Sequence, residues 1–288
     1  MEVIHFDEPG EFQDHVLAYL AQHEAENNLI LGILANLIGG EYRDHQPYLA
    51  VFRDAGEIQV VSLCTPPHPT LISYKIPPLE TEVLRAMLAD MQETLQQDFR
   101  GLHGNKEFVS CLVSEWEKKT GIEAVQSMSM QIYKLEEVQP VSGIPGEMRL
   151  AEKGDRSLLE EWFAGFHHEA LKEEPDPKRV QRQVKHYLSA DPQIRGLTLW
   201  ESAGQPVSMA GYDGPTPNGI RIGAVYTPTA QRKNGYASAL TARLSQHLLD
   251  AGYGFCFLFA DLLNPISNHI YQKIGYKPVC DSARYLFV

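Results

Sequence analysis

The chain has 288 residues, of which 43% are hydrophobic and 22% are charged, and its formal net charge is −12. This composition is typical of a folded globular protein and excludes a disordered chain. The negative charge argues against binding to duplex nucleic acid or to an anionic membrane surface, because both require a basic face.

The sequence shows no signal for export or for crossing a membrane. The opening residues, MEVIHFDEPGEF, lack a basic start and an apolar core, so we expect no signal peptide. The longest apolar stretch, LILGILANLIGG, is shorter than the roughly 18 residues of a membrane span. The four cysteines lie far apart, without CxxC or zinc spacing, which favours free thiols in a reducing cytosol. We therefore expect a cytoplasmic protein without a metal site.

Apolar periodicity predicts the elements of the first half. These are a helix over 9–38, strands near 48–52, 58–63 and 71–76, helices over 79–97 and 107–121, and a strand over 127–135. The following stretch, EEVQPVSGIPGEM, contains two prolines and two glycines and has no apolar periodicity. We place a linker at 139–147, between domains at 1–138 and 148–288.

The second half repeats this alternation. It predicts a strand at 147–151, helices over 156–171 and 178–188, and strands at 197–202, 206–212 and 219–227. A helix from Gly235, a strand at 255–260, a short helix at 264–275 and a strand at 283–288 follow.

The two halves also share a local sequence. EKKTGIEAV, from Glu117, aligns without a gap with YQKIGYKPV, from Tyr271, at an offset of 154 residues (271 minus 117). In both copies a glycine, Gly121 or Gly275, follows a predicted helix, where a C-cap is needed. The match indicates an internal duplication.

The junction VYTPTAQRKNGYASAL joins a predicted strand to a predicted helix. The first N–H groups of a helix lack intrahelical partners and carry partial positive charge, so they favour an anion. Gly235 permits close approach of the backbone and a positive φ, while Arg232 and Lys233 add charge for phosphate oxygens. The pattern R-x-x-G-x-A is neither a Walker loop nor a dinucleotide fingerprint. An ordinary turn carrying surface cations is the alternative.

Downstream, DLLNPISNHIYQKIGY places Asn264 and Pro265 at a helix start, with Tyr271 later in that helix. With these two motifs and the order of elements, the second half resembles the GNAT superfamily of acyl-CoA N-acyltransferases. The resemblance implies an α/β fold, with a mixed, mostly antiparallel sheet flanked by helices, in two tandem lobes. It also implies acetyl-CoA as cosubstrate and a small-molecule or peptide amine as acceptor.

In a protein of this family, residues 232–238 would hold the coenzyme pyrophosphate, and strand residues 225–227 would splay from their neighbour and pair with the pantetheine arm. The implied coenzyme-binding residues are Val225, Tyr226, Thr227, Arg232, Lys233, Asn234, Gly235, Tyr236, Ala237, Ser238 and Asn264. Tyr271 would protonate the departing sulfur, although it also fits an apolar helix face, and Asn264 is equally a helix cap. The general base is left open among Glu169, His168, His167 and Asp213; we take Glu169 as the first candidate.

The offset places Glu117 at the position of Tyr271, and the acidic stretch PLETEV at that of the phosphate loop. Acids there would repel phosphate, so we predict that the first lobe is GNAT-like without a coenzyme site. The sequence thus predicts an N-acetyltransferase acting by direct attack in a ternary complex. The alternative is a non-catalytic acyl-CoA-binding sensor or scaffold module.

Overall fold

The computed structural model describes residues 1–40, 46–76, 79–170 and 172–288. The chain forms two compact units. The first comprises Met1–Ile132, Ala260–Leu263 and Pro278–Val288, and the second comprises Tyr133–Phe259 and Asn264–Lys277. The last strand of the chain therefore packs with the first unit. The predicted domains at 1–138 and 148–288, with a linker at 139–147, divide the chain between its two sequence repeats. This division stays a prediction.

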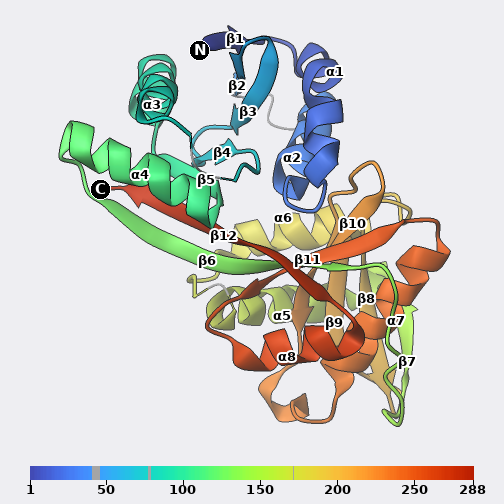
Figure 1. The fold of residues 1–288 in the computed structure, drawn as a ribbon. Coiled ribbons are helices and arrows are strands. Elements are labelled where there is room, and N and C mark those ends of the chain that lie inside the picture. The colour runs from blue at the N-terminus through green and yellow to red at the C-terminus, as the bar shows by residue number, and fades with distance from the viewer. Residues whose placement is uncertain (41–45, 77–78, 171) are drawn as a thin grey trace. The chain divides into compact units, whose positions relative to one another are not determined.

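The first unit is a sheet with helices on both faces. Its elements are β1 (Glu2–His5), α1 (Pro9–Leu20), η1 (Ala21–His23), α2 (Asn28–Ile38), β2 (Tyr48–Asp54), β3 (Glu57–Cys64), β4 (Thr70–Ile72), α3 (Thr81–Leu95), η2 (Gln96–Asp98), β5 (Gly101–Asn105), α4 (Lys106–Thr120) and β6 (Ala124–Leu135). Strands β1 to β4 pair antiparallel in order, and β4 and β5 pair in parallel. Helices α1 and α2 bury one face, while α3 and α4 bury the other (Figure 1).

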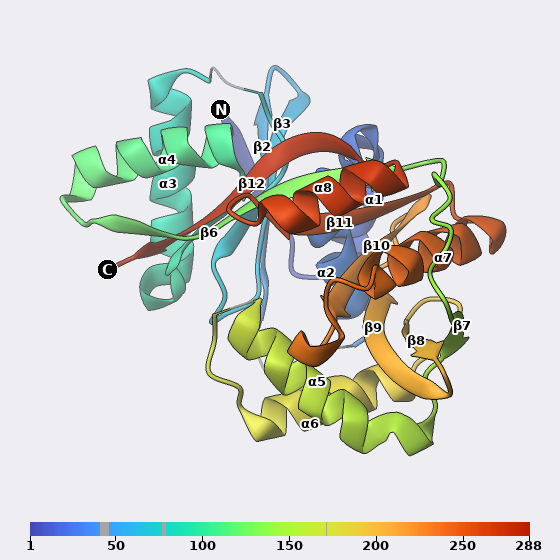
Figure 2. The same ribbon diagram turned by 90° about the horizontal axis from the view of Figure 1, so that it is seen from below.

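The second unit has the same design. The second half of the chain supplies β7 (Glu147–Leu150), η3 (Lys153–Asp155), α5 (Arg156–Glu169), α6 (Pro177–Leu188), β8 (Gly196–Ser202), β9 (Gln205–Asp213), β10 (Gly219–Tyr226), η4 (Thr229–Gln231), α7 (Tyr236–Asp250), β11 (Phe255–Asp261), α8 (Pro265–Ile274) and β12 (Lys277–Phe287). Of these, β12 pairs with β5 and belongs to the first unit. Strands β7 to β10 pair antiparallel, and β10 pairs with β11 in parallel. Helices α5 and α6 bury one face of this sheet, and α7 lies on the opposite face (Figure 2).

The order of helices and strands is the same in both halves of the chain, and each half places a parallel strand pair among antiparallel ones. The predicted fold class, a mixed and mostly antiparallel sheet flanked by helices in two lobes, is confirmed. The two glycines of the sequence repeat are C-caps, as expected. Gly121 follows α4 with φ 71°, and Gly275 follows α8 with φ 111°, both in the left-handed region that suits glycine.

The predicted helix over 9–38 is wrong as a single element, because the chain leaves the helix between α1 and α2. Two asparagine side chains satisfy main-chain groups there. Asn27 donates from Nδ2 to the Leu20 carbonyl at 3.1 Å, and its Oδ1 accepts from Tyr74 N at 2.7 Å. Asn28 donates to the Ala25 carbonyl. Such side-chain bonds compete with helix hydrogen bonds, and apolar periodicity does not register them.

Two strands were not predicted, and one is shorter than predicted. Strand β1 has only four residues, and β5, GLHGN, holds two glycines and no apolar alternation. Strand β4 covers two residues of the predicted 71–76 segment and adds Thr70. These strands are specified by pairing with their neighbours rather than by their own residues.

Candidate active site

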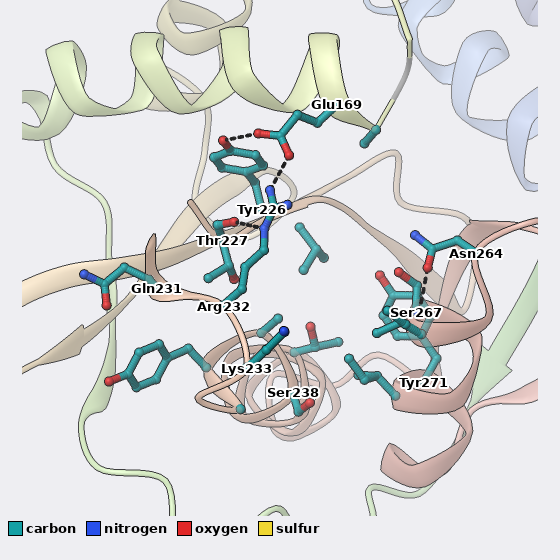
Figure 3. Close-up of a pocket in the computed structure, with 18 residues that line it drawn as sticks. Glu169, Tyr226, Thr227, Gln231, Arg232, Lys233, Ser238, Asn264, Ser267 and Tyr271 are labelled. Atoms are coloured by element: carbon teal, nitrogen blue, oxygen red, sulfur yellow. Dashed lines mark hydrogen bonds and ion pairs between the residues drawn. The ribbon is translucent and has the colours of Figure 1, made fainter. Parts of the chain in front are cut away.

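A cavity of about 440 Å³ lies in the second unit, where the ends of α5 and β10 meet the starts of α7 and α8 (Figure 3). Nearly all of the residues predicted for the site line it. They are Glu169, Val225, Tyr226, Thr227, Arg232, Lys233, Gly235, Tyr236, Ala237, Ser238, Asn264 and Tyr271. Asn234 is absent from this wall and instead donates to the Gln231 carbonyl at 3.1 Å. Segments about 100 residues apart in the sequence thus meet at one hollow.

The two central strands diverge at the cavity. Strand β10 pairs with β11 from Gly219 to Arg221, and in the described part of the chain this pairing goes no further. On its other side β10 pairs with β9, with a register shift between Gly223 and Tyr226. Ala224, inside that shift, has φ 48° and marks a β-bulge. The expected splay is therefore present, and the β11-facing edge of β10 beyond Arg221 lacks strand pairing, as the addition of an extended ligand requires.

The start of α7 forms an anion cradle. Gly235 is the N-cap with φ 81°, and Lys233 also has a positive φ of 65°. Ala239 N donates to the Gly235 carbonyl at 3.0 Å, which begins the hydrogen-bond ladder of the helix. The N–H groups before it have no acceptor one turn back, so they point out of the helix end with partial positive charge. When left-handed residues alternate with residues of ordinary conformation, their main-chain N–H groups form a concave surface that suits a phosphate group.

The two cations of the loop behave differently. Figure 3 shows the Lys233 side chain directed into the cavity near α7, whereas Arg232 extends away toward Glu169. Arg232 donates from Nε to the Thr227 carbonyl at 2.9 Å and forms an ion pair with Glu169 through Nη2. Its guanidinium carbon lies 5.8 Å from the centre of the Tyr226 ring. Among the described residues, no partner is found for the Lys233 ammonium.

Glu169, in the last turn of α5, is held from two elements. It accepts a hydrogen bond from the Tyr226 hydroxyl at 2.9 Å in addition to its pair with Arg232. The Arg232 hydrogen bond is the main cause of a Glu169 pKa below its usual range. Burial first, and then the bond to Glu169, raise the pKa of Tyr226. Glu169 is therefore an ionised carboxylate and a weak base.

The opposite wall of the cavity comes from α8. Asn264 is the N-cap, accepting from Ser267 N at 3.1 Å, and Pro265 is the first helical residue. Tyr271 lines the cavity nearly two turns later in the same helix. Its ring centre lies 5.9 Å from that of Tyr276, and burial raises its pKa to about 12. The Tyr271 hydroxyl has no hydrogen-bond partner among the described residues, and it stays protonated at neutral pH.

The other three base candidates do not line the described wall of this cavity. Asp213 accepts two bonds from Arg221, at 2.9 and 2.7 Å, and one from Tyr187 at 2.8 Å. Burial raises its pKa, but the Arg221 charge and the bonds outweigh burial and lower it. His167 is buried and bonds Gln183 at 2.9 Å, while His168 is exposed. Asp213 and His167 are therefore structural residues.

Sequence reasoning did not place six further lining residues in the site. They are Ala170, Gln231, Thr241, Ile266, Ser267 and Ile270. Helical spacing could have indicated some of them, because Thr241 lies three residues after Ser238 on α7, and Ser267 lies four before Tyr271 on α8.

The equivalent positions of the first unit carry acids. Helix α3 has Glu80 as its N-cap and Glu82 in its first turn, without a glycine. Glu117, at the position of Tyr271, accepts from Ala124 N at 2.9 Å and so holds the main chain beyond α4. Pro78, at the start of the predicted acidic stretch, lies outside the described residues. The described part of this loop offers negative charge where an anion site needs positive charge.

The diverging parallel strands and the exposed helix start are features that the resemblance to the GNAT superfamily leads one to expect. Residues 156–276 match the model of the acetyltransferase (GNAT) family. This match confirms the resemblance seen in the sequence, and the family and fold support acyl transfer as the general chemistry. No curated protein matches the sequence.

Solved structures extend the likeness to the whole chain. It is similar to a GCN5-related N-acetyltransferase from Sphaerobacter thermophilus (TM-score 0.62, 16% identity, covering 99% of this chain and 95% of that chain). It is also similar to a GNAT-family acetyltransferase from Colwellia psychrerythraea (0.60, 9%, 100% of both chains). A third is a tandem GNAT protein from the clavulanic acid biosynthesis pathway (0.57, 10%, 100% and 98%). At these identities the likeness concerns the fold alone.

Within residues 1–40, 46–76, 79–170 and 172–288, no helix has the length and apolar character needed to cross a membrane. Over the same ranges, no group of three or more His, Cys, Asp or Glu side chains could hold a metal ion.

Proposed function

We propose that the second unit transfers an acetyl group from acetyl-CoA to a primary amine of a small molecule or peptide, by direct attack in a ternary complex. The observation that carries this proposal is one cavity that joins a diverging strand end, a helix N-terminus and the Tyr271 hydroxyl. These can serve as an edge for the pantetheine amides, a cradle for the pyrophosphate and a proton donor for the thioester sulfur, the three groups that an acyl-CoA presents.

The coenzyme would bind along this wall. The N–H groups at the start of α7, from about Lys233 to Ser238, would hold the pyrophosphate, with the Lys233 ammonium adding charge. The free main chain at the end of β10 would pair with the pantetheine amides, and Asn264 would contact the same arm. An N–H of Val225 or Tyr226 would stabilise the oxyanion of the tetrahedral intermediate.

The reaction is aminolysis of a thioester. The amine nitrogen uses its lone pair to form the C–N bond, and the C–S bond then breaks with its electron pair on sulfur. Nitrogen becomes more acidic as the C–N bond forms, so Glu169 can accept its proton, directly or through water, despite its low pKa. Tyr271 donates a hydrogen bond, and finally a proton, to the departing sulfur.

The test is amine-dependent release of the coenzyme thiol, measured over a panel of amines for the natural protein and for Tyr271→Phe. We expect turnover to fall at least about tenfold in Tyr271→Phe, since removing a positioned proton donor costs this much or more. The acetyl-CoA dissociation constant should change less than about twofold, because the ring remains.

Two results would contradict the proposal. Unchanged turnover in Tyr271→Phe would remove that residue from the chemistry. Acetyl-CoA binding by the natural protein without turnover of any amine in the panel would favour a non-catalytic acyl-CoA-binding module.

A further inference from the structure

Arg232 and Lys233 are neighbours in the sequence, but their side chains go to different places. The backbone is extended at Arg232, with φ −70° and ψ 165°, and left-handed at Lys233, with φ 65°. This change of conformation separates the two cations. Figure 3 shows Lys233 reaching into the cavity beside α7, and Arg232 reaching toward the end of α5.

Within the described residues, the contacts of the Arg232 guanidinium all lie on that second side. It donates to the Thr227 carbonyl at 2.9 Å, pairs with Glu169 and lies over the Tyr226 ring. A guanidinium has a fixed planar set of donors, so binding at two edges fixes its orientation. Its charge is already opposed by a carboxylate, which reduces its attraction for a phosphate group.

Glu169 is correspondingly immobilised. One of its oxygens accepts from Tyr226 and the other pairs with Arg232. Gly165, one turn earlier in α5, makes room for this arrangement, because a Cβ there would lie 2.5 Å from the Tyr226 hydroxyl. An ionised carboxylate has about four lone-pair positions, so two remain for an amine in the cavity.

From this geometry we propose that Arg232 is a positioning residue for Glu169, and that it is not a ligand of the coenzyme pyrophosphate. It holds the carboxylate in the cavity wall, oriented toward the acceptor amine. Lys233 and the N–H groups of α7 carry the phosphate. The inference rests on the proposed function, and it assigns Arg232 and Glu169 to the side of the cavity that would receive the acceptor amine.

The groups that act on Glu169 are Arg232 from the loop, Tyr226 from β10 and His168 from α5. Of these, Arg232 contributes most to keeping the carboxylate ionised. Without it the Glu169 pKa rises toward or above the usual value, because burial opposes the charged form. The acidic limb of the pH profile, where Glu169 takes up a proton, then moves to higher pH.

The experiment compares two neutral variants of adjacent cations, Arg232→Gln and Lys233→Gln, in acetyl-CoA binding and in amine-dependent thiol release. We expect Lys233→Gln to weaken acetyl-CoA binding about fivefold or more, while Arg232→Gln changes it less than about twofold. Arg232→Gln should lower kcat about tenfold and shift the acidic limb of kcat/KM upward in pH.

Two further variants separate positioning from folding. Arg232→Lys retains the positive charge, so the acidic limb of the pH profile should stay near its natural position. The kcat should still fall in part, because lysine lacks the planar set of donors that orients Glu169. Glu169→Gln in the Arg232→Gln background should cost little more in kcat than Glu169→Gln alone, because the two residues act as one unit.

Equal weakening of acetyl-CoA binding by Arg232→Gln and Lys233→Gln would overturn the inference, and so would a pH profile that Arg232→Gln leaves unmoved. Neither result would disturb the proposed transferase activity. Absence of acetyl-CoA binding by the natural protein would remove both proposals together.

Discussion

Gly165 is a single residue whose absent side chain shapes the active site. It lies inside α5, where glycine is about 0.5–1 kcal/mol less favourable than alanine. A Cβ at this position would lie 2.5 Å from the Tyr226 hydroxyl and 2.8 Å from its ring carbon Cζ. The local cost to the helix thus gives Tyr226 the space to reach Glu169.

Gly165→Ala should therefore destabilise the protein despite its better helix propensity. The new methyl group displaces the Tyr226 ring and breaks its bond to Glu169, so we expect a loss of about 1 kcal/mol and a melting temperature about 2–4 °C lower. Thermal unfolding measures this change.

The matched control is Gly154→Ala, because Gly154 has open space where its Cβ would lie and does not need a positive φ. That variant should melt at or slightly above the natural temperature. If both variants were equally stable, Tyr226 would not require the space that Gly165 leaves.

Single residues were also where sequence reasoning reached its limit. Gly235 could be placed at a helix start from its own pattern, and Tyr271 could be placed through the resemblance to the GNAT superfamily. The partnership of Arg232 with Glu169 could not be predicted, since it joins residues 63 positions apart and depends on the fold. As a result the sequence grouped Arg232 with Lys233 by charge alone, although the fold directs the two side chains apart.

At the scale of elements, long amphipathic segments were predictable and irregular ones were not. Helices α6 and α7 and strands β8 to β11 lie close to their predicted positions, because periodicity and capping residues both mark them. The bulge in β10 has no sequence signal, since alanine at φ 48° is tolerated only because neighbouring strands impose it. That bulge is nevertheless what turns the strand end toward the cavity.

The two copies of each element differ at the positions that form the cavity. Helices α7 and α3 occupy the same place in the order of their units, but α7 begins with Gly235 and α3 with Glu80 and Glu82. Helices α8 and α4 both end at a left-handed glycine. The glycines that cap these helices are thus shared by the two repeats. The glycine at a helix start, which suits an anion, is present in the second copy, where the first copy has acids.

For the whole molecule, the first unit makes stability depend on pH. His103 on β5 is buried and bonds Ser282 on β12 at 3.2 Å. Burial, with a smaller effect of the Arg284 charge, lowers its pKa to about 4. The unfolded chain, with an ordinary histidine pKa near 6.5, binds a proton that the folded chain does not between these values. Stability is therefore fully present above about pH 6.5 and is lost as pH falls toward 4.

We expect His103→Gln to reduce this dependence. Between pH 7.5 and pH 5 the natural protein should lose about 2 kcal/mol more unfolding free energy than the variant loses, since each pH unit below 6.5 contributes about 1.4 kcal/mol. Denaturant unfolding of the full chain at both pH values provides the comparison. Parallel losses in the two proteins would show that His103 titrates normally.

The central claim is one working coenzyme site, at the start of α7. The most direct measurement is calorimetric titration with acetyl-CoA of the natural chain, Ala237→Gln and Ala237→Glu. Ala237 lines the cavity in the first turn of α7. A carboxylate added there interacts favourably with the helix dipole, so the fold should be preserved. The same carboxylate would repel the phosphate groups of the coenzyme. We predict one site per chain, weakened in Ala237→Gln by the larger side chain and lost in Ala237→Glu by the added charge. Two sites per chain, or equal binding by the two variants, would contradict the account.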